Sequence, residues 1–151
     1  MIPKRKRKPA KFQGLPFALP VRKRGEDKKA LEKECLELWS VFIRLRDKYC
    51  RYCKKVHNFN DLYAHHIYSV ACKATKFDPE NGICLCFKCH IPIAHRLFET
   101  FRRWLLQNWM SLEKYEALGA RAETRMKYTV GDLKLIKMDL KQKIERMGGR
   151  P

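Results

Sequence analysis

An α+β domain is the fold that the sequence predicts, and two observations lead to it. Apolar residues recur at helical spacing near both ends of the chain, whereas between residues 49 and 85 this period gives way to short β-prone segments. Two C-x2-C pairs bracket that central region. We therefore expect a strand-containing core within residues 26–151, with one helix before it and two or three helices after it.

Charge sets a second region apart from this domain. The 151 residues include 34 Lys and Arg against 16 Asp and Glu, a net charge of +18, and residues 1–25 hold nine of the cations and no acid. Such an excess attracts polyanions, so nucleic acid is the expected partner. Prolines and glycines among the cations predict a disordered basic arm over residues 1–25, with a solubilising tail or a localisation signal as the alternative. Its candidate DNA contacts are Lys4, Arg5, Lys6, Arg7 and Lys8.

Composition also excludes several classes of protein. A hydrophobic fraction of 45% is ordinary for a globular domain and argues against a wholly disordered chain. The apolar runs fall far short of the ~18 consecutive residues that a membrane span needs. Residues 11–19 are too interrupted by polar residues, glycine and proline to form a secretory signal. We therefore expect a cytoplasmic protein without a membrane partner.

The first helix is predicted from about Glu26, where apolar residues begin to recur at intervals of three and four. We expect this stripe to pack on the protein's own core, with Cys35 as a buried thiol. Because the spacing is regular over about three turns, a dimer seam is the alternative. The stripe consists of Leu31, Cys35, Leu38, Phe42, Leu45 and Tyr49.

The remaining elements follow in order. Residues 62–70 and 83–85 are predicted as two short strands joined by a long loop. A helix is expected to begin near Pro92, and Ser111 is the expected N-cap of a short helix that ends at Gly119. The core-facing residues of the first of these two helices are Ala94, Phe98, Phe101 and Leu105, and those of a last helix are Leu133, Ile136, Leu140, Ile144 and Met147.

Four of the seven cysteines form the two close pairs: Cys50, Cys53, Cys86 and Cys89. Thiols stay reduced in a chain that is not secreted, and a doubled C-x2-C presents four thiolates to zinc. The 32 residues between the pairs exceed the spacing of a short zinc ribbon and leave room for a hairpin that carries a site. The alternative is a set of reduced core cysteines.

Inside this cysteine frame come His65, His66, Asn81 and His90, in that order. The order resembles that of the HNH nucleases. Their ββα-metal fold has paired polar residues at the end of one strand, an asparagine on the loop, and a histidine or asparagine at the start of the helix. The resemblance implies a ββα-metal (HNH) core clamped by a four-cysteine structural zinc (Zn2+). It also implies an endonuclease that hydrolyses DNA phosphodiesters with a catalytic divalent ion, Mg2+ or Mn2+.

A narrower resemblance, over roughly residues 28–147, is to the phage recombination endonucleases of the NinG/Rap type. It implies branched DNA substrates such as Holliday junctions and D-loops, a homodimer that places two cuts, and the host-cell cytoplasm for a phage-encoded protein. The family usually shows Gly-His-Tyr and Asn with a downstream Lys-x-Gly-Asn at two places where this chain differs. The segments that carry the resemblance are Leu38–Asp47, Ala64–Ile67, Phe77–Asn81 and Tyr128–Leu133, and the departures are His65-His66-Ile67 and His90, Ile93, His95 and Arg96.

The residue types fit a division of labour within such a site. Hydrolysis needs a base that deprotonates water and a cation that neutralises charge on the phosphate and on the departing oxygen. An imidazole with a pKa of about 6.5 suits the first task, and we assign His66 as general base. Neighbouring strand residues face opposite ways, so His65 is free to join His90 as a ligand of the catalytic ion. Asn81 is expected to fix the loop and to orient His66 through its carboxamide.

His95 and three arginines complete the candidate site. His95 lies just over one helical turn beyond His90, which makes it a candidate third ligand, with a surface or phosphate-contacting role as the alternative. Arg96, Arg102 and Arg103 are candidates for contacts with the DNA backbone, and a solvated helix face is the alternative for them.

Other functions share parts of this pattern. An HNH nickase or homing-type endonuclease would use the same residues on linear duplex. A non-catalytic zinc module that binds DNA or RNA would share the charge and the cysteines without needing His66. A structural recombination or packaging partner would depend on the arm and the helices alone.

Overall fold

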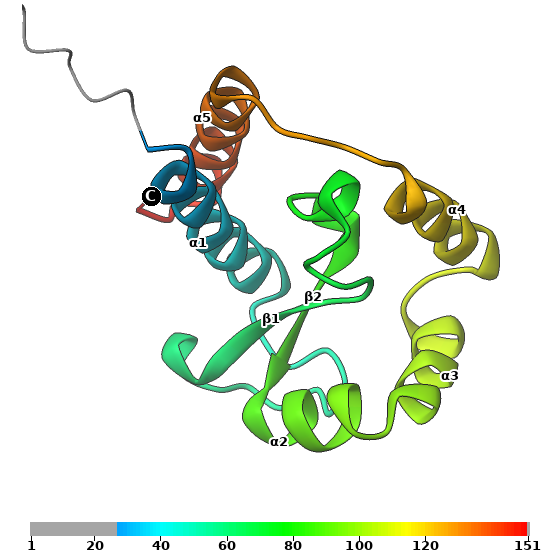
Figure 1. Cartoon of the computed structure of the whole chain (residues 1–151). Coiled ribbons are helices and arrows are strands. Elements are labelled where there is room, and N and C mark those ends of the chain that lie inside the picture. Colours follow the sequence, from blue (N-terminus) through cyan, green and yellow to red (C-terminus); the bar gives the residue numbers. More distant parts are fainter. Residues whose placement is uncertain (1–26, 151) are drawn as a thin grey trace, which may run out of the picture.

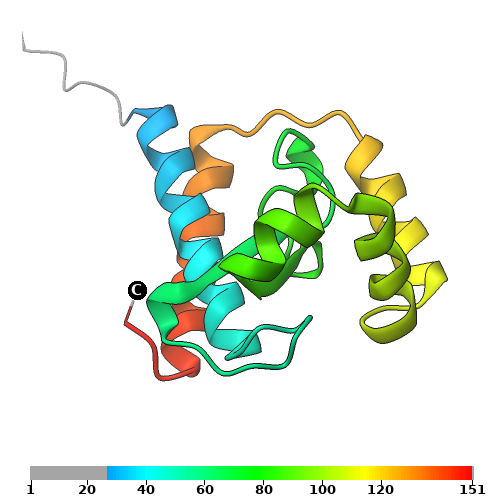
Figure 2. The same cartoon turned by 90° about the horizontal axis from the view of Figure 1, so that it is seen from below.

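The structure is a computed structural model that describes residues 27–150, so the predicted basic arm and its candidate DNA contacts lie outside the described residues. Viewed from below, the small sheet lies between the helix pair α1 and α5 on one side and the helices α3 and α4 on the other (Figure 2). The predicted combination of helices with one strand pair is confirmed. None of the helices in residues 27–150 is both long and apolar enough to cross a membrane.

The predicted first helix is present as α1 (Lys28–Asp47), which Asp27 caps by accepting a hydrogen bond from the Lys29 backbone N–H. Its apolar stripe packs against α5 (Val130–Arg146), and the two helices lie side by side (Figure 1). The Cys35 thiol is fully buried and donates to the Leu133 carbonyl. The stripe is therefore covered by the chain's own last helix, as expected for a stripe that packs on the protein's own core.

Two short antiparallel strands form the sheet. β1 (Leu62–His66) pairs with β2 (Gly82–Cys86) in the register His66 opposite Gly82. The prediction of a first strand that continues to Val70 is wrong, because the backbone N–H groups of Ile67 and Tyr68 bond to the main chain and side chain of Asn81 instead of to a strand. The segment between the strands is the predicted long loop, with 3-10 turns at Lys73–Thr75 and Pro79–Asn81, and another such turn, Phe59–Asp61, precedes β1.

The chain turns helical directly after β2, earlier than expected. A short α2 (Phe87–Cys89) continues into a π-helical turn, η4 (His90–His95), and then into α3 (Phe98–Asn108). The prediction that a helix starts near Pro92 is wrong, since Pro92 lies inside the π-helical turn η4, which is wider than an α-helical turn. Proline has no backbone N–H and cannot continue the i→i−4 ladder, which accounts for the widening at this place.

One predicted core residue of this helix is also misplaced. Phe101 and Leu105 are buried as expected, whereas Phe98 is 48% exposed. Phe98 is the first residue of α3, and helical side chains lean toward the preceding turn. α3 has no such turn before Phe98, so the ring projects beyond the packed face.

The last two helices follow the prediction in part. Ser111 caps α4 (Leu112–Glu123) as expected, but the helix continues past Gly119. A Cβ at Gly119 would lie 2.6 Å from the Tyr68 hydroxyl, so this glycine permits a close approach and does not end the helix. In α5 the predicted residues Leu133, Leu140 and Ile144 are buried, Ile136 is partly buried, and Met147 lies beyond the helix end and is exposed.

Candidate active site

The two cysteine pairs lie close together in the fold. Cys50 and Cys53 lie in the turn region after α1, whereas Cys86 ends β2 and Cys89 ends α2. The four sulfur atoms lie within 4.8 Å of one another, and all four thiols are free of disulfides. Cys50, Cys86 and Cys89 are buried. A cluster of this composition can hold a structural metal ion such as zinc.

The thiols of this cluster differ in how readily they ionise. Burial raises the pKa of Cys50, and burial together with neighbouring thiols raises the pKa of Cys89. For Cys53, burial acts in the same direction, but hydrogen bonds with the Lys55 backbone and the Cys50 side chain outweigh it and lower the pKa to about 6. The Cys53 thiolate therefore forms readily, whereas Cys50 and Cys89 need a positive partner before they ionise.

Three histidines form a second cluster. β1 contributes His65 and η4 contributes His90 and His95, and ring nitrogens of all three lie within 4.8 Å of one another. Residues five apart would point about 140° away from each other around an α-helix. The i→i+5 repeat of a π-helix places them on one side instead. The wide turn is therefore what adds His95 to the pair His65 and His90.

Two of these imidazoles, His65 and His90, are held in the neutral form. Burial, reinforced by His90 and His95, lowers the pKa of His65 to about 3. Burial likewise lowers the pKa of His90, with His95 as the second cause. Neutral imidazole is the form that binds metal ions, so His65 and His90 are ready to act as donors at neutral pH.

His66 has surroundings of its own on the other side of β1. Its ring stacks on Trp39 of α1 with the centroids 3.9 Å apart and the planes at 14°, and its Nε2 lies 2.9 Å from the Lys76 carbonyl oxygen. A carbonyl oxygen only accepts hydrogen bonds, so Nε2 carries the proton and Nδ1 is left as an acceptor. Burial lowers the pKa of His66, against the hydrogen bond to Lys76, which raises it.

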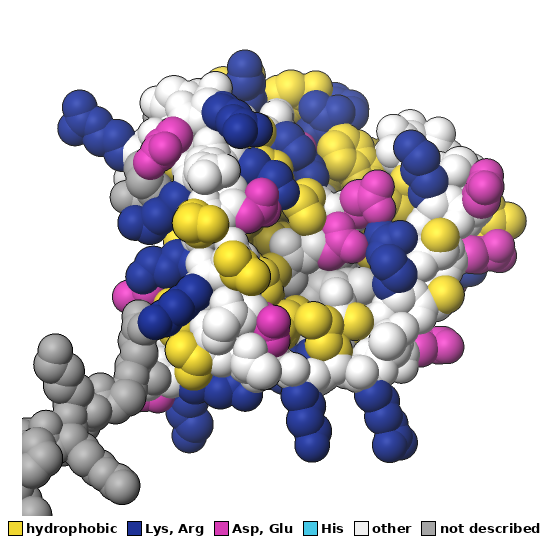
Figure 3. Space-filling view, turned by 90° about the horizontal axis from the view of Figure 1, so that it is seen from above, with side chains coloured by type: hydrophobic (Ala, Val, Ile, Leu, Met, Phe, Trp, Pro, Cys, Tyr) yellow, Lys and Arg dark blue, Asp and Glu magenta, His cyan; other side chains and the backbone are white. Residues whose placement is uncertain are grey.

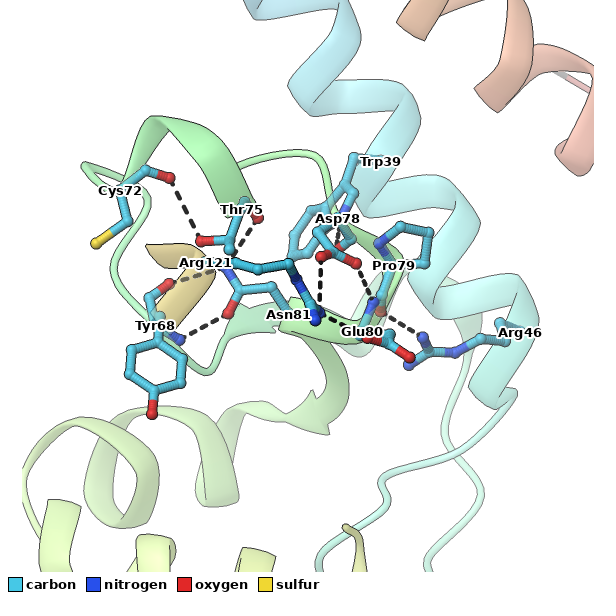
Figure 4. A network of polar contacts seen from close by, with 10 residues as sticks. All are labelled: Trp39, Arg46, Tyr68, Cys72, Thr75, Asp78, Pro79, Glu80, Asn81 and Arg121. Carbon is cyan, nitrogen blue, oxygen red and sulfur yellow. Dashed lines mark hydrogen bonds and ion pairs between the residues drawn. The ribbon is translucent and has the colours of Figure 1, made fainter. Parts of the chain in front are cut away.

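Asn81 is fully buried, and its side chain forms hydrogen bonds with the main chain of the loop between the strands (Figure 4). Its Oδ1 accepts from the Tyr68 backbone N–H at 2.7 Å, and its Nδ2 donates to the carbonyls of Tyr68 and Thr75. The expectation that Asn81 fixes the loop is thus met in its contacts. Its carboxamide has no bond to His66, which Trp39 and the Lys76 carbonyl orient instead.

The four candidate histidines of the motif share one pocket. A cavity of 430 Å³ at the end of β1 is lined by His65, His66, His90 and His95, with Phe98 also on its wall. A second cavity of 510 Å³ lies against α1 and includes His66 and Trp39 in its lining. His66 therefore borders both cavities, and the whole histidine set lies at one end of β1.

Lysine and arginine side chains are spread over the surface of the described residues (Figure 3). Arg96 and Arg103 are exposed, whereas Arg102 is partly buried, lies 3.9 Å from Glu99 and packs over the Tyr115 ring. One face of the molecule shows lysine and arginine side chains spread around its edge, with acidic side chains between them (Figure 3).

Sequence reasoning missed two of the contacts that shape the site. Trp39 is 1% exposed and reads as an ordinary core residue, and nothing in the apolar stripe signals a ring stacked on a histidine. The contribution of Lys76 is a main-chain carbonyl, which no residue type announces. Only the position of the loop relative to β1 identifies it.

Comparisons with known proteins leave the site to be judged on its geometry: no family model, no curated protein and no solved structure matches the chain.

Proposed function

We propose that this chain is a metal-dependent DNA endonuclease of the HNH type, with His66 as general base. The observation that carries the proposal is the pocket of 430 Å³ in which His66 lies beside a cluster of three histidines. A potential base next to a potential metal site is the pair of features that phosphodiester hydrolysis requires. The order of His65, His66, Asn81 and His90 inside the cysteine frame, which resembles the HNH nucleases, supports the same reading.

The protein's own residues supply the base and its orientation. With the Nε2 proton bonded to the Lys76 carbonyl, Nδ1 of His66 is the atom that takes a proton from the attacking water. The stack on Trp39 holds the ring plane, and burial keeps the imidazole neutral at the start of the reaction.

His65, His90 and His95 are the residues that would hold the catalytic ion. When bound, a divalent cation supplies positive charge for the phosphate and the departing oxygen. Three imidazoles match a site that keeps an open position for substrate. Mg2+ prefers oxygen ligands, so this donor set favours Mn2+ or a later transition metal over Mg2+.

We assign a structural Zn2+ to Cys50, Cys53, Cys86 and Cys89. Four thiolates close the coordination sphere and leave no position for water, which suits a structural role and not a catalytic one. The cluster joins the turn after α1 to the end of β2 and so clamps the base of the hairpin that bears His65 and His66.

The substrate follows from charge and from the resemblance. The net charge of +18 supports nucleic acid, with Lys4, Arg5, Lys6, Arg7, Lys8, Arg96, Arg102 and Arg103 as the proposed backbone contacts. Branched recombination intermediates and a homodimer that makes two cuts are what the NinG/Rap resemblance adds.

The test is cleavage of an end-labelled four-way junction beside its matched linear duplex, with Mn2+, Co2+, Ni2+, Zn2+ and Mg2+ in separate reactions. The wild type, His66→Gln and the control Leu135→Ala on the exposed face of α5 are compared. We expect cleavage by the wild type and the control and a loss of about 100-fold or more in His66→Gln.

Each other outcome has a defined meaning. Equal cutting of junction and duplex would keep the chemistry and favour the nickase or homing-type alternative. Tight binding without cleavage in any metal would overturn the proposal in favour of a non-catalytic zinc module.

A further inference from the structure

Exposed aromatic rings gather around the histidine cluster. In residues 27–150 the exposed phenylalanine and tyrosine side chains are Phe59, Tyr63, Phe87 and Phe98. Phe59 is covered on one face by the Arg44 guanidinium, 4.2 Å from the ring centroid. Of the other three, Tyr63 contacts a proposed metal ligand, Phe87 contacts Tyr63, and Phe98 lines the pocket of the histidines.

Ring contacts place each of the three. Tyr63 stacks on His90 with the centroids 5.5 Å apart and the planes at 11°, and Phe87 lies 6.2 Å from Tyr63. Phe98 lines the 430 Å³ pocket together with all four histidines of the site. The exposed fractions are 40% for Tyr63, 60% for Phe87 and 48% for Phe98.

Neither the core nor chance scatter explains this grouping. Single exposed apolar residues are normal on a protein surface, but rings that share one site form a patch with a common use. Residues 27–150 keep 25 of the 34 cations and 15 of the 16 acids, so the surface around the rings belongs to a basic domain. A cationic surface with exposed rings is the combination that binds single-stranded nucleic acid, because each unpaired base offers a flat face for stacking.

We propose that Tyr63, Phe87 and Phe98 form a stacking surface for unpaired nucleobases beside the histidine cluster. The inference rests on the proposed function and deepens it by naming the substrate class: DNA whose strand is unpaired next to the bond that is cut. Bases in a continuous duplex are already stacked on one another and leave the rings unused. A branched or frayed strand presents bases that the rings can hold.

The test measures binding alone, without added divalent ion and with the full chain. Fluorescence anisotropy gives the affinity for a labelled 20-nucleotide oligo-dT and for a blunt 20-base-pair duplex, each over a salt series. The variants are Phe98→Leu, Phe87→Leu and Phe98→Trp, and Phe59→Leu is the matched control, since its ring is exposed but lies under Arg44. A thermal melt of each variant verifies the fold.

We expect Phe98→Leu and Phe87→Leu each to weaken oligo-dT binding by about 5- to 100-fold. The duplex affinity and the slope of log K against log salt stay unchanged, because no phosphate contact is lost. Phe98→Trp and Phe59→Leu bind as the wild type does.

Unchanged oligo-dT affinity in both leucine variants would overturn the inference, and so would an equal loss for oligo-dT and duplex. The nuclease proposal is judged separately by the junction assay. If the protein cleaves DNA but its binding does not depend on the rings, only the stacking inference is overturned. If binding depends on the rings but no cleavage occurs, only the nuclease proposal is overturned. A wild type that binds neither DNA overturns both.

Discussion

His90 and His95 hold their Nε2 atoms 3.1 Å apart although they lie five positions apart along the chain. The π-helical turn around Pro92 creates this closeness, and the His65 ring meets both from the neighbouring strand, with centroid distances of 5.2 and 4.9 Å. A regular α-helix through the same residues would leave His65 with one partner. A backbone irregularity thus turns a pair of candidate ligands into a set of three.

Metal content tests this set directly. Loaded with zinc or cobalt and desalted, the wild type should carry two ions per chain, one for each cluster. His95→Ala should carry one, because two imidazoles bind far more weakly than three. His66→Ala is the control and should keep both ions, since His66 lies outside the cluster. Two tightly bound ions in His95→Ala, measured by atomic emission, would disprove the assignment.

The cysteine cluster should be required for folding. Cys53→Ser removes one thiolate of the set, and a structural zinc site contributes its binding free energy to folding. We expect this variant to lose its cooperative thermal transition, and we expect the same of the wild type in excess chelator. Cys72 is half-buried and outside the cluster, so Cys72→Ser should change the free energy of unfolding by no more than about 1 kcal/mol. A thermal transition like that of the wild type in Cys53→Ser would show that the cysteine cluster is not required for folding.

Asn81 makes a sensitive test of the loop. In Asn81→Asp the new carboxylate oxygen cannot donate to the carbonyls of Tyr68 and Thr75, and a charge is placed in a fully buried position. The free energy of unfolding should fall by about 3 kcal/mol or more, measured by urea titration. The same change at the exposed Asn60 should be close to neutral. Equal stability of the two variants would show that the hydrogen bonds of Asn81 do not hold the loop.

Glu32 links α1 to the loop that supplies the Lys76 carbonyl. Its carboxylate lies 2.7 Å from Lys73 Nζ and 2.6 Å from Lys76 Nζ, and these hydrogen bonds lower its pKa from 4.5 to about 2. A carboxyl with a lowered pKa in the folded state stabilises the fold above the pKa of the unfolded chain, and this contribution is lost as the pH falls toward the folded value.

Glu32→Gln should therefore be less stable than the wild type by about 1 kcal/mol at pH 7. The difference should begin to shrink below about pH 4.5 and approach zero near pH 2. Paired urea titrations at each pH measure it, since contributions common to both chains cancel. A difference that stays constant across this range would mean that the ion pairs contribute nothing.

Local patterns made the elements with strong periodicity predictable. The stripe of α1 and the core positions Leu133, Leu140 and Ile144 of α5 follow from apolar spacing, and Ser111 follows from capping chemistry. The errors arise where tertiary contacts override local signals. Gly119 looks like a helix end but accommodates Tyr68, and Asn81 ends β1 early by taking the backbone groups that a longer strand would use.

Some residues of the candidate site could likewise be predicted from the sequence, and others could not. Residue type and order identify the ligand candidates His65 and His90, because imidazoles in that arrangement are chemically informative. The addition of His95 depends on the pitch of one turn, and the orientation of His66 depends on Trp39 and a main-chain carbonyl. Neither pitch nor carbonyl direction is encoded in a residue's identity, so only the folded chain reveals them.

The cysteine and histidine clusters share a short stretch of backbone, since Cys89 and His90 are adjacent and lie between Cys86 and His95. An ion that fixes Cys86 and Cys89 also fixes the turn from which His90 and His95 project. We therefore expect the two affinities to be thermodynamically linked, with each ion strengthening the binding of the other by the same factor. Loading should then be cooperative, because an ion at the thiolate site would preorganise the imidazoles.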